Sequence, residues 1–211
     1  MVIFPVLAKI NAYDGMRRGM RLGEALEVAR LLEESGCSAI EVSSGTVAEG
    51  LSIMRGPELP VEALLAANFR VMKMPAAVKQ LLAGLLPVLA PSSPKPYRNY
   101  NVEAARAIRK QVSIPVIAVG GIHTLTDVGS AIGSGAADFV SMSRPFIIEP
   151  DILRKLQEGR QQGSRCIMCN YCAIMIETDP LRCWHGKLPV NLFPERRGVA
   201  DIRENQLSSQ P

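Results

Sequence analysis

The chain is poor in aromatic residues and in histidine. Only 5% of its 211 residues are aromatic and two are histidines, so few side chains are present that could stack on bases. Neither histidine lies beside an evident serine or cysteine nucleophile, and no GxSxG, HExxH or Walker sequence occurs. The formal net charge is +4, from scattered lysines and arginines. These shortages argue against a nucleic-acid partner, a common hydrolase site and a P-loop.

Long hydrophobic runs are also missing. The apolar stretch 2–8 lacks a basic start and a small-residue cleavage site, which predicts a strand rather than a signal peptide. The apolar stretch 81–90 is short and contains Pro87, so it predicts no membrane span. Without an export signal we expect a reducing cytoplasm, where five cysteines indicate metal or thiols more than disulfides.

Short apolar strands alternate with helical patterns along the chain. We expect strands at 6–11, 39–43, 114–119 and 139–142, and helices at 22–34, near 61–68, near 76–86, at 102–111 with Asn101 as cap, at 126–132 and at 151–157. The strands are rich in Val and Ile, as in a parallel sheet covered on both faces. The sequence therefore predicts an α/β fold with four parallel βα units, divided as a βα domain at 1–160, a cysteine-rich segment at 161–190 and a polar tail at 191–211.

Two strand ends carry residues suited to a phosphate. Gly120 and Gly121 follow the third strand, where glycine lets backbone N–H groups approach an anion. Ser143 and Arg144 follow the fourth strand, and arginine can donate two parallel hydrogen bonds to phosphate. The alternative is a tight turn beside an arginine paired with a carboxylate. In β/α barrels the loops after the last two strands often form a phosphate site, which favours the first interpretation.

Other strand ends are less informative. Lys9 sits near the end of the first strand, where it could stabilise a negative charge on a bound cofactor or extend into solvent. Residues 43–45, Ser-Ser-Gly, could line a pocket or form a turn. His123 is expected in a solvated loop, although contact with a ligand is the alternative.

The end of the chain carries a cysteine cluster. Cys166, Cys169 and Cys172 are each three residues apart, and Cys183 follows. Four thiolates of this spacing suit an iron–sulfur cluster or zinc, and metal-free thiols are the alternative. His185 could substitute for a ligand, whereas Cys37 is predicted to be a small buried residue.

Five segments occur together in the order known from one enzyme family. They are residues 5–15, 38–45, 114–122, 137–152 and 166–172. The chain thereby resembles the Old Yellow Enzyme family of FMN-dependent NADH:flavin oxidoreductases, especially its iron–sulfur, 2,4-dienoyl-CoA reductase-like branch. That resemblance implies the C-terminal half of a TIM barrel with FMN at the mouth.

The resemblance also assigns roles to individual residues. It implies that Lys9 lies at the N1/O2 edge of the flavin, and that Gly120, Gly121, Ser143 and Arg144 bind the FMN phosphate. It implies a 4Fe–4S cluster on Cys166, Cys169, Cys172 and Cys183. The substrate-binding pair and the proton donor of the family belong to the first four strands, which have no counterpart here, so no catalytic residue is assigned.

The expected function is an FMN-dependent NAD(P)H oxidoreductase of the ene-reductase type, in a truncated or split form. Its substrate would be a small activated alkene or enoyl thioester. Self-association, or a second chain that supplies the missing half-barrel, would complete the fold. The alternative is a non-catalytic module that binds a phosphorylated ligand or carries electrons for a partner chain.

Overall fold

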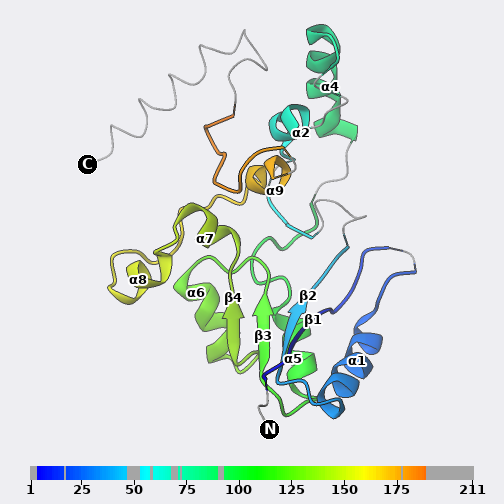
Figure 1. Cartoon of the computed structure of the whole chain (residues 1–211), viewed down its shortest axis with the longest axis vertical. Helices are drawn as coiled ribbons and strands as arrows, with labels where there is room; N and C mark the ends of the chain where they lie inside the picture. Colours follow the sequence, from blue (N-terminus) through cyan, green and yellow to red (C-terminus); the bar gives the residue numbers. More distant parts are fainter. Residues whose placement is uncertain are drawn as a thin grey trace. The chain divides into compact units, whose positions relative to one another are not determined.

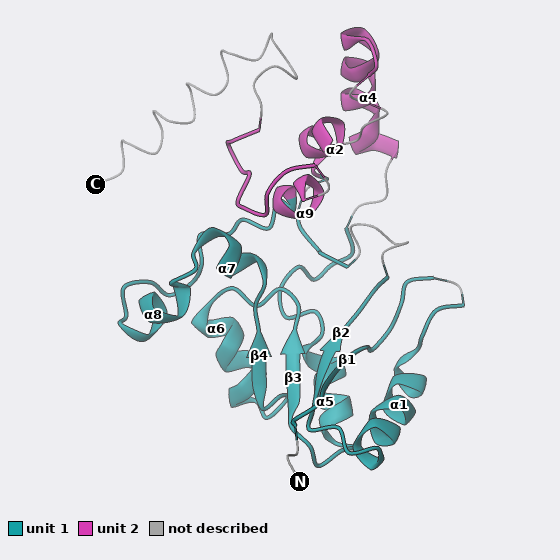
Figure 2. Cartoon of the chain, in the orientation of Figure 1, with its two compact units in different colours: residues 1–59, 91–170 teal, residues 60–90, 171–211 magenta. Residues whose placement is uncertain are grey.

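A computed structural model gives the fold (Figure 1). It describes residues 4–16, 18–46, 53–57, 59–67, 71, 73–89, 93–176 and 178–188. The predicted polar tail at 191–211 lies outside these residues. The chain divides into two compact units, which are coloured separately in Figure 2. Unit 1 contains residues 1–59 and 91–170, and unit 2 contains residues 60–90 and 171–211.

Unit 1 is built on a parallel sheet of four strands. They are β1 (Leu7–Asn11), β2 (Ala39–Ser43), β3 (Val116–Val119) and β4 (Phe139–Ser141), hydrogen-bonded in the order β1-β2-β3-β4. Lys9 pairs with Glu41, Glu41 with Ile117, and Ile117 with Phe139. Because neighbours in the sheet are also successive strands in the chain, the sheet has the simple βα order expected from the sequence. The predicted α/β fold is confirmed.

Helices connect the strands of unit 1. These are α1 (Leu22–Glu34), α5 (Val102–Arg109), α6 (Leu125–Val128) with the π turn η2 (Gly129–Gly133), α7 (Arg144–Ile148) and α8 (Ile152–Gln157). Buried side chains of α1, α5 and η2 pack on one face of the sheet, around Ile40, Val42, Val116 and Ala118. This apolar layer forms the core of unit 1, because burial of such side chains is the main stabilising contribution to a fold.

The opposite face of the sheet has no helix layer among the described residues. Side chains alternate along a strand, so the neighbours of the core residues point to this second face. Leu7 and Phe139 on it are 60% and 57% exposed. A fully parallel sheet is normally covered on both faces. In the described part of unit 1, helices therefore cover one of the two faces that a parallel sheet normally buries.

Unit 2 is helical in its described part. It contains α2 (Val61–Ala67), α4 (Ala76–Leu89) and α9 (Tyr171–Met175). Ala63, Ala66, Ala67, Met175 and Trp184 form its small core. None of the described helices is both long enough and apolar enough to cross a membrane.

Several local predictions are wrong for identifiable reasons. Asn101 does not cap α5 with its side chain, because its amide donates to the carbonyl of Val119 over 2.7 Å instead. The helix after β3 begins earlier than expected, because the Thr124 hydroxyl accepts from the backbone N–H of Asp127 and caps α6. Pro87 lies inside α4 rather than ending it. The short helices α7 and α9 were not anticipated.

Candidate functional site

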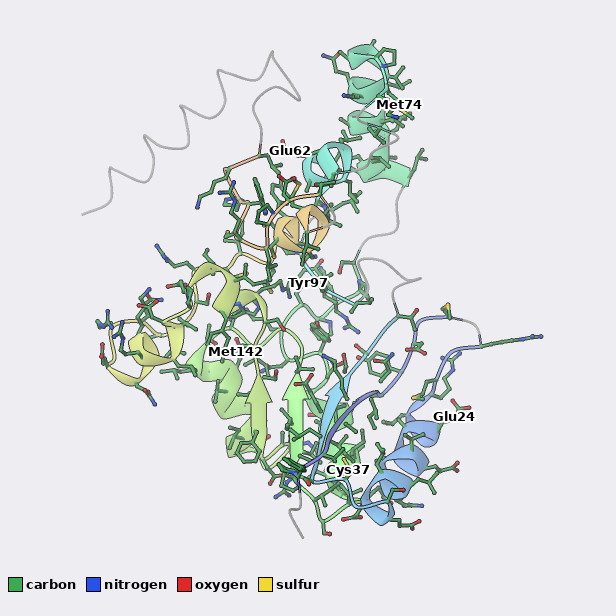
Figure 3. All side chains as sticks on the ribbon, in the orientation of Figure 1. Glu24, Cys37, Glu62, Met74, Tyr97 and Met142 are labelled. Atoms are coloured by element: carbon green, nitrogen blue, oxygen red, sulfur yellow. The ribbon has the colours of Figure 1, made fainter. Side chains whose placement is uncertain are left out.

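A cavity of about 240 Å³ lies at the carboxyl ends of the strands of unit 1. Its walls come from the ends of all four strands, including Lys9, Ser43, the segment 119–123 and the segment 141–145. Gly120, Gly121, Ser143 and Arg144, which were predicted from separate strand ends, all line it. Figure 3 labels Met142, which also lines the cavity, and Tyr97 on the segment that crosses the strand ends. The volume is below the roughly 300–1,000 Å³ of pockets that enclose drug-sized ligands, so the cavity suits a headgroup.

The glycine pair is required first by packing. A Cβ on Gly121 would lie 2.2 Å from the carbonyl oxygen of Tyr97, and one on Gly120 would lie 2.6 Å from the ring of Tyr100. Both glycines have positive φ, +128° and +71°, where other residues are strained. This close approach is not visible in the sequence, because no local pattern identifies the segment 97–100 as a neighbour of the glycine pair.

The same glycines also have backbone N–H groups without a described hydrogen-bond acceptor. Both residues are buried, and no described residue accepts a hydrogen bond from the backbone N–H of Gly120 or Gly121. Buried backbone N–H groups nearly always have a partner. An anion in the cavity would provide that partner.

Arg144 is buried beside these glycines. The residue is 8% exposed. Its Nη1 donates to the carbonyl of Arg55 over 3.0 Å and to Oδ1 of Asn170 over 2.5 Å. Among the described residues, nothing accepts from its Nε or Nη2, and no carboxylate pairs with it. The alternative of an arginine neutralised by a carboxylate is therefore not found in the described part.

A second buried arginine lies next to Arg144. Arg55 is 6% exposed, and its guanidinium stacks on the ring of Tyr100 with 4.4 Å to the ring centroid. It also donates to the carbonyl of Pro96 and to the hydroxyl of Tyr13. Its Nε has no hydrogen-bond partner in the described structure. The two arginines thus place two buried positive charges close together, and no described carboxylate pairs with either one. This is unusual, because buried charges are normally paired.

Lys9 reaches the cavity wall but has a partner that sequence reasoning missed. Its Nζ lies 2.8 Å from Oε1 of Glu41, the residue opposite it in the sheet. The Lys9 side chain is 58% exposed, and such exposed ion pairs contribute little to stability. The ion pair thus leaves Lys9 able to turn toward a ligand. Ser43 also lines the cavity, whereas the backbone N–H of Gly45 donates to the carbonyl of Tyr13 over 3.0 Å.

His123 is buried, not solvated as expected. The residue is 2% exposed and lines the cavity, and its Nδ1 has no partner in the described structure. Burial, together with the nearby charges of Arg144 and Arg98, lowers the pKa of His123 to about 4, while Asp127 opposes that shift. The imidazole is therefore neutral at pH 7. The sequence signal, a histidine two residues after a glycine pair, was present but did not distinguish a solvated loop residue from a buried one.

A buried carboxylate anchors the chain that leads to the cysteines. Glu149 is 1% exposed. Burial raises its pKa, but the backbone N–H of Arg165 and the side chains of Gln161, Lys155 and Ser164 outweigh burial and bring the pKa to about 2. These contacts tie the segment 161–165 to the end of α7.

The cysteines do not form a metal site in the described residues. No group of three or more His, Cys, Asp or Glu side chains there is arranged to hold a metal ion. Cys166 and Cys169 belong to unit 1, and Cys172 and Cys183 to unit 2. None of the four is in a disulfide. Cys37 is 7% exposed and packs in the core of unit 1, as predicted.

Comparisons with known proteins agree with the fold and with the resemblance seen in the sequence. Residues 70–163 match the NADH:flavin oxidoreductase / NADH oxidase family. A 4,4'-dithiodibutanoate disulfide reductase from Rhodococcus erythropolis is 29% identical over 175 residues, which are 82% of this chain and 41% of that protein. An NADH oxidase from Thermoanaerobacter brockii is 29% identical over 200 residues, which are 93% of this chain and 24% of that protein. The resemblance found in the sequence is confirmed.

A solved structure supports the fold. The complex of 2-naphthoyl-CoA reductase with 2-naphthoyl-CoA aligns with a TM-score of 0.59 at 16% identity, over 91% of this chain and 24% of that chain. The chain spans well under half the length of these relatives.

The buried state of His123 predicts a pH dependence of stability. Its pKa is about 4 in the folded chain and 6.5 without the fold, so between these values the unfolded chain binds a proton that the folded chain does not. The free energy of unfolding should therefore fall as pH drops from about 6.5 toward 4, by on the order of 3 kcal/mol.

Urea unfolding of wild type and His123→Gln across pH 4–7 measures this. The variant should lose most of that slope, while His185→Gln, at an exposed histidine, should keep it. Equal slopes in wild type and His123→Gln would contradict the assignment.

Proposed function

Residues 70–163 belong to the NADH:flavin oxidoreductase / NADH oxidase family, and on that premise we propose that the cavity of unit 1 holds the phosphate of FMN. The chain would then be the cofactor-phosphate half of an FMN-dependent NAD(P)H oxidoreductase of the Old Yellow Enzyme type. Family membership supports the flavin and the nicotinamide reductant. The phosphate site rests on the geometry of the cavity.

One observation carries the proposal. The buried Arg144 lines a cavity together with Gly120 and Gly121, and none of the described residues supplies a carboxylate to its guanidinium or an acceptor to the backbone N–H groups of these glycines. A phosphate monoester offers the negative charge and the acceptor oxygens that this donor set lacks. The cavity volume matches a headgroup. The residues present therefore fit the phosphate end of FMN.

Each residue of the site has a distinct task in this proposal. Gly120 and Gly121 present backbone N–H groups, Ser143 presents a hydroxyl, and Arg144 supplies charge through the guanidinium nitrogens that face no described acceptor. Lys9, at the cavity wall, would exchange its exposed pairing with Glu41 for the polar edge of the flavin ring. When bound, FMN accepts a hydride from NAD(P)H and passes it to an acceptor.

We further propose that substrate chemistry needs polypeptide beyond the four described βα units. The second face of the sheet exposes Leu7 and Phe139, and β1 and β4 each have one edge without a described partner. In a complete barrel eight strands close on themselves and remove such edges. The remaining strands would come from the same protein, from a second copy or from another chain, and would carry the acceptor-binding groups. An activated alkene or enoyl thioester is the proposed acceptor class.

The alternative function is a module that binds a phosphorylated ligand without turnover. The small cavity favours it, because the cavity accounts for a headgroup and not for a substrate. Both functions share the phosphate site and differ in whether NAD(P)H reduces the bound flavin once the missing strands are supplied.

The four cysteines support a separate proposal, a 4Fe–4S cluster. The support is the donor set: Cys166, Cys169 and Cys172 at intervals of three residues, with Cys183 as a remote fourth thiolate. Because the described residues contain no preformed metal site, no step of the proposed chemistry is routed through these cysteines.

The phosphate assignment predicts that the chain prefers FMN to riboflavin, which lacks only the phosphate. Arg144→Ala should reduce this preference by at least about tenfold, since a hydrogen bond to a charged group contributes about 1.5–3 kcal/mol. Equilibrium titrations of flavin fluorescence measure both dissociation constants. Arg154→Ala, which removes an exposed arginine on α8, is the matched control and should keep the wild-type ratio. Wild-type protein that binds the two flavins equally would refute the phosphate site.

The incomplete sheet predicts no turnover by this chain alone. The full chain loaded with FMN should oxidise NADPH no faster than free FMN at the same concentration, because in this proposal the groups that position the nicotinamide and the acceptor belong to the missing strands. Anaerobic stopped-flow absorbance at the flavin band measures this. Rapid bleaching of the bound flavin by NADPH would show that the chain reduces its flavin without the missing strands, and would contradict this proposal.

The cysteine proposal predicts a brown protein after anaerobic reconstitution with iron and sulfide. We expect broad visible absorption and about four irons per chain. Cys172→Ala should lose the absorption, whereas Cys37→Ala, in the core of unit 1, should retain it. A colourless product, or one zinc per chain in its place, would overturn the cluster.

A further inference from the structure

We infer that Asn170, inside the cysteine motif, is a positioning residue that fixes Arg144 for phosphate binding. This inference rests on the proposed function and adds to it a link between the cysteine segment and the cavity. No role for this residue followed from the sequence.

The amide of Asn170 is held on both sides. Its Oδ1 accepts from Nη1 of Arg144 over 2.5 Å, and its Nδ2 donates to the carbonyl of Met54 over 2.6 Å. Only this orientation of the amide fits, because the guanidinium can only donate and the carbonyl can only accept. Asn170 is 2% exposed, so water does not replace either contact.

Asn170 and the neighbouring chain restrict the guanidinium to one orientation. Nη1 donates to Asn170 and to the carbonyl of Arg55, which uses up that nitrogen. Nε and Nη2 have no acceptor among the described residues, and Arg144 lines the cavity. The nitrogens that remain are those available to a phosphate. An arginine fixed in this way loses less side-chain entropy when it binds.

The backbone around Asn170 is also committed to this contact. Met168 and Asn170 have φ of +60° and +63°, and such left-handed residues persist where surrounding contacts hold them. Gly56 packs so closely that a Cβ there would lie 2.1 Å from the carbonyl oxygen of Met168. The cysteine segment thus lies directly on the loop 54–56, and Met54 of that loop lines the cavity. A change in the conformation of the segment would move the acceptor of Arg144.

A pair of matched substitutions tests the inference. Asn170→Gly removes the amide, and glycine tolerates the positive φ. Asn99→Gly is the control, because Asn99 also has a positive φ, of +52°, and contacts Asp127 rather than Arg144. Binding of FMN and of riboflavin to the full chain is measured for each variant, together with urea unfolding.

Asn170→Gly should weaken FMN binding by about tenfold while riboflavin binding stays within about twofold of wild type. Asn99→Gly should change neither. A second variant, Asn170→Asp, keeps an acceptor oxygen and a residue type that adopts positive φ, but its charge neutralises Arg144. It should also lose the preference for FMN, and more strongly at low ionic strength.

The outcomes separate this inference from the proposed function. If wild type prefers FMN and both Asn170 variants keep that preference, the inference fails and the phosphate site stands. An equal loss of FMN and riboflavin binding in both Asn170 variants would show a general structural role and would also overturn it. If wild type shows no preference, the proposed function fails, and the inference fails with it.

Discussion

The burial of the Arg144 guanidinium without a described carboxylate is the constraint on which the site depends. A charge in that position is tolerated because a carbonyl and an amide oxygen accept from Nη1, but these neutral groups leave its positive charge uncompensated. The glycine pair across the cavity adds two buried backbone donors. A dianionic headgroup would compensate the charge of Arg144 and accept hydrogen bonds from both N–H groups. A neutral ligand would not compensate the charge.

The main elements of the fold were predictable because their signals are local. The strands at β1 and β2, and helix α1, follow from apolar periodicity and from glycines that end helices, and their bounds agree with the structure to within one residue. Gly120, Gly121, Ser143 and Arg144 could be assigned to one edge for the same reason, since the carboxyl ends of neighbouring parallel strands meet. The proposed cofactor class came from the family resemblance and not from these local patterns.

What could not be predicted depends on contacts between residues far apart in the sequence. Arg144 and Arg55 are 89 residues apart, and Asn170 and Met54 are 116 apart, and no periodic pattern marks such pairs. Asn101 has the residue type of a helix cap, yet it serves a tertiary contact with Val119, so tertiary structure overrode a local preference. His123 was expected to be solvated, because the burial of a loop residue is not visible in its sequence neighbours. The cysteine motif was clear in the sequence, but the role of Asn170 within it was not.

A crystal structure of the full chain with FMN tests the central claim most directly. The account predicts the phosphorus atom in the cavity at the ends of β3 and β4, with its oxygens within hydrogen-bonding distance of the N–H groups of Gly120 and Gly121 and of Nε or Nη2 of Arg144. Nη1 should still donate to Asn170. A phosphate bound at another place on the chain, with the Arg144 cavity filled only by water, would contradict the account.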